Sequence, residues 1–119
     1  MNIDIPGLNV NNGLELYDGS EKIYLRFLRI YVSSMSAALE NLRKVSKEAL
    51  PEYVVSVHGV KGISETIGAD EVSNMARQLE AMAREGDLDG VLARNDAFIG
   101  FAENFVGDIR NWLEKNTSN

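Results

Sequence analysis

The sequence predicts an all-α protein, an antiparallel up-and-down four-helix bundle with a short additional N-terminal helix. Apolar residues recur at three- and four-residue steps in four successive segments, and no segment alternates like a β-strand. The breaks between these segments are short, which favours antiparallel neighbours. A chain of 119 residues with 45% hydrophobic residues has the size of one domain. We therefore expect a single domain over 1–119, with the bundle over roughly 20–116 and an N-terminal lead over 1–19.

The first long helix is predicted from Glu21. A short helical turn over 14–17 precedes it, and Asp18 and Gly19 break the pattern before Ser20, which suits an N-cap. The apolar face then consists of Tyr24, Phe27, Leu28, Tyr31, Met35, Ala38, Leu39, Leu42 and Val45. Such a stripe is typical of a helix with one face toward a core.

The second and third helices are delimited by proline and glycine. Pro51 suits the first turn of the second helix, which we expect to run to about Ile67 and to stop at Gly68. Asp70 can cap the third helix, which Gly86 ends. The inward residues of the third helix are predicted to be Val72, Met75, Ala76, Leu79, Met82 and Ala83.

The last helix is predicted to start after Asp87, which can serve as its N-cap. Its apolar stripe consists of Leu88, Val91, Leu92, Phe98, Ile99, Ala102, Phe105, Ile109, Trp112 and Leu113. Gly90, Gly100 and Gly107 are unusual inside a helix, because each costs up to about 1 kcal/mol relative to alanine. Close approach of a neighbouring helix is one reason to keep them.

Composition excludes several classes of function. The net charge of −6 argues against nucleic acid as the main partner, because phosphate binding needs clustered Lys and Arg. Without cysteine the chain has no disulfide and no thiolate metal site. No stretch approaches the roughly 20 apolar residues of a membrane span, and the N-terminus lacks the pattern of a signal peptide. We expect a cytoplasmic protein that does not bind a membrane.

His58 is the only histidine, and helical geometry predicts that it points away from the core. At 100° per residue, the far side of the second helix holds Tyr53, Ser56, Val57, Val60, Ile63, Ser64 and Ile67. Within about 60° of His58 lie Pro51, Val54, Val55, Lys61, Gly62 and Glu65. Val54 and Val55 add exposed apolar surface, which is typical of a docking patch.

The neighbours of His58 suit a phosphorylated imidazole. Lys61 and Gly62 lie one turn further along on the same face. Lys61 offers a compact positive charge to phosphoryl oxygens, and Gly62 lacks a side chain that would crowd the ring. A neutral imidazole keeps a lone pair for attack on phosphorus. Residue type alone still favours an ordinary solvated histidine, so the surrounding motif decides the interpretation.

Residues 58–69 read His-Gly-Val-Lys-Gly-Ile-Ser-Glu-Thr-Ile-Gly-Ala. This block resembles the signature of the histidine-containing phosphotransfer (HPt) domain family, His-x-Leu-Lys-Gly-x-Ser/Ala followed by Ile/Leu-Gly and often Ala. Val60 replaces the usual leucine, a mild apolar change. The segment 14–28 resembles the short helix, acidic turn and first long helix of the family, and 79–87 resembles the end of its third helix. The resemblance covers roughly 8–115.

The resemblance implies a phosphorelay intermediate of two-component signalling. His58 would accept a phosphoryl group from a receiver-domain aspartate and pass it to another receiver, Lys61 would hold the phosphoryl oxygens, and Gly62 would leave room for them. Such a chain is a relay protein rather than an enzyme. It has no nucleotide site, cofactor or metal of its own, and Mg²⁺ is expected on the receiver partner. The expected partners are response-regulator receiver domains, or a hybrid sensor histidine kinase that contains the domain, and the chain is expected to be a monomer.

Two other functions remain open at this point. The dimerisation and histidine-phosphorylation domain of a sensor kinase also presents a histidine on helices, but it typically has an acidic residue directly after it, where this chain has Gly59. A helical interaction module without phosphotransfer would make His58 incidental. A metal site is a poor fit, since His58 has no ligand partner at i+4. General-base catalysis is also a poor fit, and Glu65 on the same face reads as a solvated helix residue.

Overall fold

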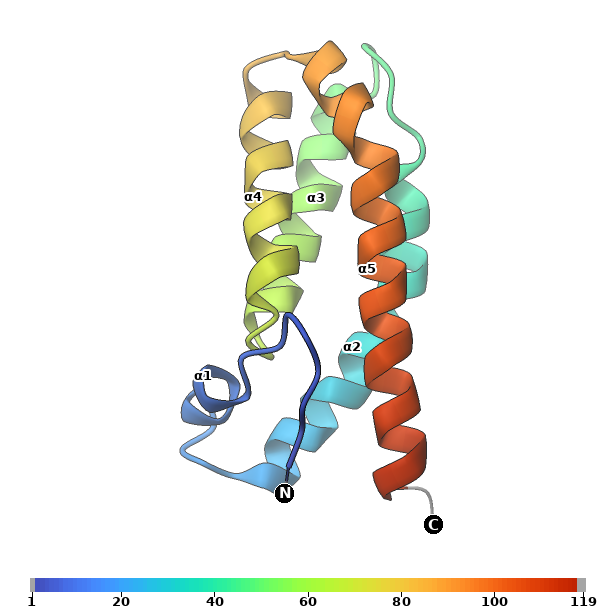
Figure 1. Ribbon diagram of the computed structural model, residues 1–119. Coiled ribbons are helices and arrows are strands. Elements are labelled where there is room, and N and C mark those ends of the chain that lie inside the picture. The colour runs from blue at the N-terminus through green and yellow to red at the C-terminus, as the bar shows by residue number, and fades with distance from the viewer. Residues whose placement is uncertain (1, 118–119) are drawn as a thin grey trace.

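The computed structural model describes residues 2–117, so residues 1 and 118–119 of the predicted domain lie outside the described part. Five helices follow in order: α1 (Val10–Glu15), α2 (Glu21–Leu42), α3 (Leu50–Glu65), α4 (Asp70–Arg84) and α5 (Leu88–Thr117). Residues 2–117 contain no strand. The predicted all-α bundle with a short N-terminal helix is therefore confirmed (Figure 1).

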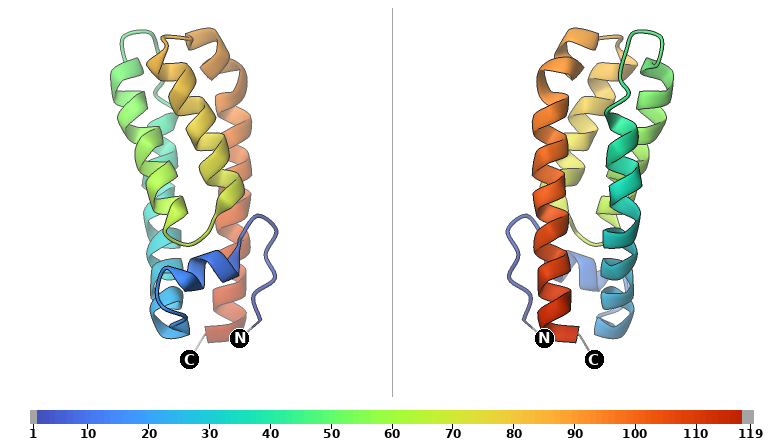
Figure 2. Two further views of the ribbon diagram at one scale, coloured as in Figure 1. Left: turned by 90° about the vertical axis from the view of Figure 1, so that its left-hand side faces the viewer. Right: turned by 90° about the vertical axis from the view of Figure 1, so that its right-hand side faces the viewer.

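The four long helices form a closed ring in chain order. α2 packs against α3 and α5, and α4 packs against the same two helices. At 1.5 Å per residue the 30 residues of α5 extend about 45 Å, which equals the longest dimension of the molecule, 45 Å. α2 and α5 continue below the turn between α3 and α4, and α1 with the N-terminal lead lies across them there (Figure 2). The α3–α4 pair, which carries His58, is thus one side of the bundle.

The predicted cap residues and Pro51 lie at the starts of helices in the structure. The Ser20 hydroxyl accepts a hydrogen bond from the Ile23 N–H (3.3 Å), and the Asp87 carboxylate accepts one from the Gly90 N–H (2.9 Å), as expected for N-caps. Pro51 is the second residue of α3. Gly90 is explained by the Asp87 cap, because a Cβ at 90 would collide with that carboxylate.

Other predicted boundaries were wrong by a few residues. α1 spans Val10–Glu15 instead of 14–17, because the Asn9 side chain caps it by accepting from the Asn12 N–H (3.2 Å). α2 ends at Leu42, which leaves Val45 in the connection 43–49. α3 ends two residues before Ile67, and Asp70 is the first residue of α4 rather than its cap, since Ala69 occupies that position.

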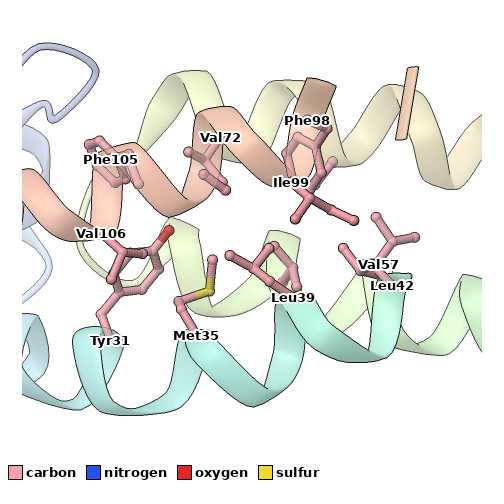
Figure 3. Packing of buried hydrophobic residues seen from close by; sticks show 14 of the residues in the cluster. Tyr31, Met35, Leu39, Leu42, Val57, Val72, Phe98, Ile99, Phe105 and Val106 are labelled. Atoms are coloured by element: carbon pink, nitrogen blue, oxygen red, sulfur yellow. The ribbon is translucent and has the colours of Figure 1, made fainter. Parts of the chain in front are cut away.

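The core runs along the axis of the bundle and receives side chains from all four long helices. Figure 3 shows Tyr31, Met35, Leu39 and Leu42 of α2 facing Val57, Val72, Phe98, Ile99, Phe105 and Val106. Ile3 and Ile5 of the lead are also buried. Of the two adjacent residues Val91 and Leu92 in the predicted stripe, Val91 is buried, but Leu92 is 51% exposed, because it lies about 100° round the helix from the buried face.

Gly100 and Gly107 do not mark a close approach of helices. A Cβ at either position would meet nothing within 4 Å, so the predicted reason for these glycines is wrong. Nothing in the structure explains them.

Three tyrosines fix the end of α3. The hydroxyls of Tyr17 and Tyr24 donate to the carbonyl oxygens of Thr66 (2.6 Å) and Ile67 (2.8 Å). Tyr31 shares a hydrogen bond with the buried Ser64 hydroxyl (2.9 Å). The first two contacts satisfy carbonyls that the end of a helix leaves unpaired. Tyr24 and Tyr31 anchor the end of α3 to α2, and Tyr17 anchors it to the connection before α2, so the helix that carries His58 has a defined rotation in the bundle.

Candidate functional site

His58 lies in the middle of α3, on the side that faces α4. Its side chain is 57% exposed, as the helical spacing predicts. The opposite face of α3 holds Tyr53, Val57 and Val60, which are buried and fix the rotation of the helix. The imidazole is therefore presented to solvent by a rigid element rather than by a loop.

A buried carboxylate of α4 forms a hydrogen bond with the imidazole. Glu80 is only 8% exposed, and its Oε2 lies 3.0 Å from His58 Nδ1. The same oxygen accepts hydrogen bonds from Arg84 Nη2 (2.7 Å) and Nε (2.9 Å). The other oxygen, Oε1, accepts no hydrogen bond of good geometry, so the Lys61 ammonium at 3.2 Å compensates its charge. Glu80 thus links His58, Lys61 and Arg84 into one cluster, called the Glu80 cluster below.

The Glu80 cluster keeps the carboxylate ionised. Burial raises the pKa of Glu80, but the hydrogen bonds from Arg84 and His58, together with the positive charge of Lys61 beside Oε1, outweigh burial and lower the pKa to about 2. Buried ionised carboxylates persist only when they are paired in this way. At neutral pH Glu80 carries a full negative charge beside the imidazole.

The negative charge of Glu80 determines which imidazole nitrogen is available. An ionised carboxylate only accepts hydrogen bonds, so Nδ1 of His58 must carry the proton and donate it to Oε2. In the neutral ring the other nitrogen, Nε2, then holds the lone pair. The site presents a nucleophilic nitrogen of defined identity.

The lowered pKa of Glu80 predicts a contribution to stability that depends on pH. A carboxyl group whose folded pKa lies below its ordinary value of 4.5 stabilises the fold above pH 4.5 and loses that effect as the pH falls toward 2. The free energy of unfolding of the wild type should exceed that of Glu80→Gln by about 2 kcal/mol at pH 6, and this difference should shrink below pH 4.5. Urea titrations at several pH values measure it. A difference that stays constant down to pH 2.5 contradicts this prediction.

The two residues predicted beside His58 lie where the spacing places them. Lys61 is on the same side of α3 and is 19% exposed, but its ammonium is paired with Glu80 rather than fully solvated. Gly62 faces open space, since a Cβ there would meet nothing within 4 Å. Val55 is 72% exposed and Val54 is half-buried. The roles of His58, Lys61 and Gly62 stay predictions.

Sequence reasoning did not single out Glu80 or Arg84 as site residues. One signal for Glu80 was present: it follows Ala76 by four residues and precedes Ala83 by three, so it sits on the buried face of α4 where a carboxylate is out of place. Arg84 follows Glu80 by four residues, the spacing of a helical ion pair.

Two other kinds of site are not seen in the described part of the chain. Over residues 2–117, no three His, Cys, Asp or Glu side chains come together where they could hold a metal ion. Within the same range, no helix combines the length and apolarity needed to cross a bilayer.

Comparison with known proteins assigns the family. A family model for the Hpt domain matches residues 26–115, well over half of the chain. The chain belongs to the HPt domain family. HPt domains serve histidine phosphotransfer in two-component signalling, and they are phosphotransfer modules rather than nucleotide-binding enzymes. Neither the curated proteins nor the solved structures gave a match to this HPt chain.

Proposed function

We propose that this HPt domain is a phosphorelay intermediate in which Nε2 of His58 accepts a phosphoryl group from a receiver-domain aspartate and passes it to another receiver. The observation that supports this most strongly is the hydrogen bond from His58 Nδ1 to the ionised Glu80, which leaves the lone pair on Nε2 of a side chain that is more than half exposed. The partners are response-regulator receiver domains, free or within a hybrid kinase. The domain would work as a monomer, because its four long helices close their own core, and we place it in the cytoplasm, where response-regulator receivers act.

The transfer needs no proton movement on this chain. The Nε2 lone pair attacks the phosphorus of the aspartyl phosphate, the N–P bond forms, and the P–O bond breaks with its electron pair left on the aspartate. Nδ1 keeps its proton, so the phosphorylated ring carries a positive charge next to the Glu80 carboxylate. Glu80 stabilises that developing charge, and the receiver brings the Mg²⁺ that stabilises the phosphoryl oxygens.

Lys61 and Arg84 are the groups that can contact the phosphoryl oxygens. Both are paired with Glu80, the residue that also contacts the imidazole: Lys61 Nζ lies 3.2 Å from Oε1 of Glu80, and Arg84 Nη2 lies 2.7 Å from Oε2. An ammonium has two further N–H donors, and a guanidinium has three beyond the two that bind Glu80. Phosphoryl transfer depends mostly on positioning and charge stabilisation, which these donors provide.

Transfer from phosphorylated receivers tests the proposal. The chain is incubated with a panel of ³²P-labelled receiver domains and Mg²⁺, and the label must be acid-labile, base-stable and located on the peptide with His58. Phosphoramidate, which phosphorylates imidazoles without a partner, reports on the reactivity of His58 alone. Transfer from no receiver in the panel, or a label on another residue, contradicts the proposal.

Lys61→Ala should slow phosphoryl transfer by about tenfold, because one cation leaves the phosphoryl site. Lys61→Arg should restore most of the rate, since it returns the charge. Rates from quenched-flow measurements with one receiver decide the outcome. Equal transfer rates for Lys61→Ala and the wild type would show that Lys61 does not contribute to phosphoryl transfer.

Gly62→Leu should block transfer from the receiver by tenfold or more, because a side chain would project into the space that the partner occupies. The substitution should not weaken the helix, since glycine is the poorer helix former by up to about 1 kcal/mol. Gly100→Leu is the matched control: it also fills open space on a helix, but on α5. If both variants transfer at the same rate, the space above Gly62 is not used for docking.

A further inference from the structure

No other helix of residues 2–117 covers the outer face of α5. The buried residues of α5, among them Phe98, Ala102 and Ile109, face the core, and the opposite side of the helix faces solvent. In the right-hand view of Figure 2, α5 faces the viewer along its length, and no other part of the described chain crosses in front of it. The outermost positions, which we call the α5 seam, are Ala93, Ala97, Gly100, Asn104, Gly107 and Asn111.

The α5 seam differs from an ordinary solvated helix face. Charged residues make up 25% of the chain, yet none occupies a seam position. No seam residue is larger than asparagine, and a Cβ at Gly100 or Gly107 would meet nothing within 4 Å in this chain. The seam residues follow at alternating steps of four and three, which is the spacing by which two helices pack along a common line. The seam therefore has the shape that lets a second helix approach closely.

Charged residues line both edges of the α5 seam. Arg94 and Asp108 lie on one edge, and Asp96 and Arg110 lie on the other. All four are exposed, and within residues 2–117 none of them forms an ion pair. Each edge thus carries one arginine and one aspartate without a partner, and their order along the helix is opposite on the two edges.

A second copy of α5 in the antiparallel direction matches all four charges. When the two copies cross level with Ala102, Arg94 of each copy lies beside Asp108 of the other, about 3 Å apart along the axis. On the other edge, Asp96 lies beside Arg110 of the second copy with the same offset. The two-fold axis repeats both contacts, so every charge on the two edges meets an opposite charge. A parallel pair in register would instead place each arginine beside the same arginine.

The middle of this antiparallel pair is also favourable. Phe101 is 37% exposed on one edge of the seam, and the two-fold axis brings it beside Phe101 of the second copy. Glu103 on the other edge would meet Glu103 of the second copy. Its charge is already compensated, because Arg43 Nη2 lies 3.0 Å from its carboxylate.

We propose that two copies of this chain pair through the α5 seam, antiparallel and about a two-fold axis. Gly100 then faces Asn104 of the second copy, and Gly107 faces Ala97, which accounts for two glycines that contact nothing within one chain. One helix from each copy buries less than the roughly 800 Å² per partner of a standard interface, so the pairing is weak, with a Kd of order 100 μM. A free chain at micromolar concentration is therefore a monomer, whereas two copies tethered in one assembly reach an effective concentration of about 1 mM and pair.

The pairing goes beyond the proposed function and does not depend on it. α5 packs against α2 and α4, so α3, which carries His58, is the long helix on the other side of the bundle. Both His58 side chains of a pair therefore remain accessible to receivers, and phosphoryl transfer to each copy should be unchanged.

Sedimentation equilibrium of the full chain, loaded from about 10 μM to about 1 mM, tests the pairing. The average mass of the wild type should rise from that of one chain toward that of two. Gly107→Leu should keep the mass of one chain over the whole range, because its side chain fills the space that Ala97 of the second copy occupies. Its fold should persist, since nothing lies within 4 Å of the added Cβ. Gly59→Leu is the matched control: it fills open space on α3 and should pair like the wild type.

Charge reversal on one edge tests the antiparallel direction. Arg94→Asp should raise the Kd about tenfold, because it places two aspartates side by side in both symmetry-related contacts, and Asp108→Arg should do the same with two arginines. The double variant Arg94→Asp/Asp108→Arg should return the Kd to within about twofold of the wild type, since it restores opposite charges. Lys47→Glu is the control for Arg94→Asp: it changes the net charge equally, but in the connection 43–49, and should leave the Kd within about twofold.

Three outcomes overturn the pairing. The first is a wild type that stays at the mass of one chain at about 1 mM. The second is a Gly107→Leu chain that pairs like the wild type, and the third is a double variant that pairs no more tightly than Arg94→Asp. Circular dichroism checks the fold of each variant, and the charge variants decide alone if Gly107→Leu does not fold. None of these outcomes bears on the relay function, which the transfer assay tests separately.

Discussion

His58→Gln is expected to abolish phosphoryl acceptance, with a loss of at least about a thousandfold and no residual histidine labelling. An amide nitrogen has no basic lone pair to attack phosphorus, and the sequence contains no other histidine that could replace it. The fold should persist, because the side chain is more than half exposed and a glutamine amide can still donate to Glu80. We expect the melting temperature to stay within a few degrees of the wild type.

The measurement is transfer from the fastest receiver, with the chain separated from the donor and the label tested in acid and in base. Phosphoramidate provides a second readout that does not depend on docking. A His58→Gln chain that still acquires an acid-labile, base-stable label would show that another nucleophile carries the phosphoryl group. A variant that does not fold is excluded by far-ultraviolet circular dichroism before the assay.

Glu80→Ala should lower transfer about 10- to 100-fold, which is the usual effect when a carboxylate that orients a histidine is removed. Without Glu80 the proton of the neutral ring is no longer held on Nδ1, so part of the population has its lone pair on the wrong nitrogen. The carboxylate that faces the phosphorylated ring is lost as well. Glu80→Gln should fall between Glu80→Ala and the wild type, because its amide oxygen can still accept from Nδ1–H.

Nitrogen NMR of the His58 ring separates orientation from a general loss of structure. The wild type should show a protonated Nδ1 and an unprotonated Nε2 at pH 8, and Glu80→Ala should show a mixture of the two tautomers. Removal of Glu80 also leaves the partly buried Lys61 without its partner, so we expect a loss of stability of about 1 to 3 kcal/mol. Assays at 15 °C keep the variant folded.

Glu65→Ala is the matched control for Glu80→Ala. Glu65 lies on the same side of α3 as His58, but it is exposed and pairs only with Arg77 on the surface. Its removal should leave both the His58 tautomer and the transfer chemistry unchanged, since exposed ion pairs contribute about 0 to 1 kcal/mol. If Glu65→Ala and Glu80→Ala slow transfer equally, the effect is one of surface charge and the role assigned to Glu80 is wrong.

The features that the sequence by itself determined are local ones. Helices, their caps at Ser20 and Asp87, and the outward direction of His58 follow from spacing within one segment. Three- and four-residue steps define a buried face without reference to any other helix, and the same steps place Lys61 and Gly62 beside His58. The motif around His58 then indicated the family that the comparison assigned.

Tertiary structure alone decided what the imidazole contacts. Glu80 is 22 residues from His58 and on another helix, so only the packing of α4 against α3 brings its carboxylate within 3.0 Å of Nδ1. The end of α3 is likewise set by hydroxyls of Tyr17 and Tyr24, which come from outside that helix. The periodicity of apolar residues predicts which residues of a helix are buried. It does not predict which residue of a neighbouring helix each of them contacts. The nitrogen of His58 that is free to react depends on the contact with Glu80, and no spacing within α3 or α4 predicts that these two residues meet.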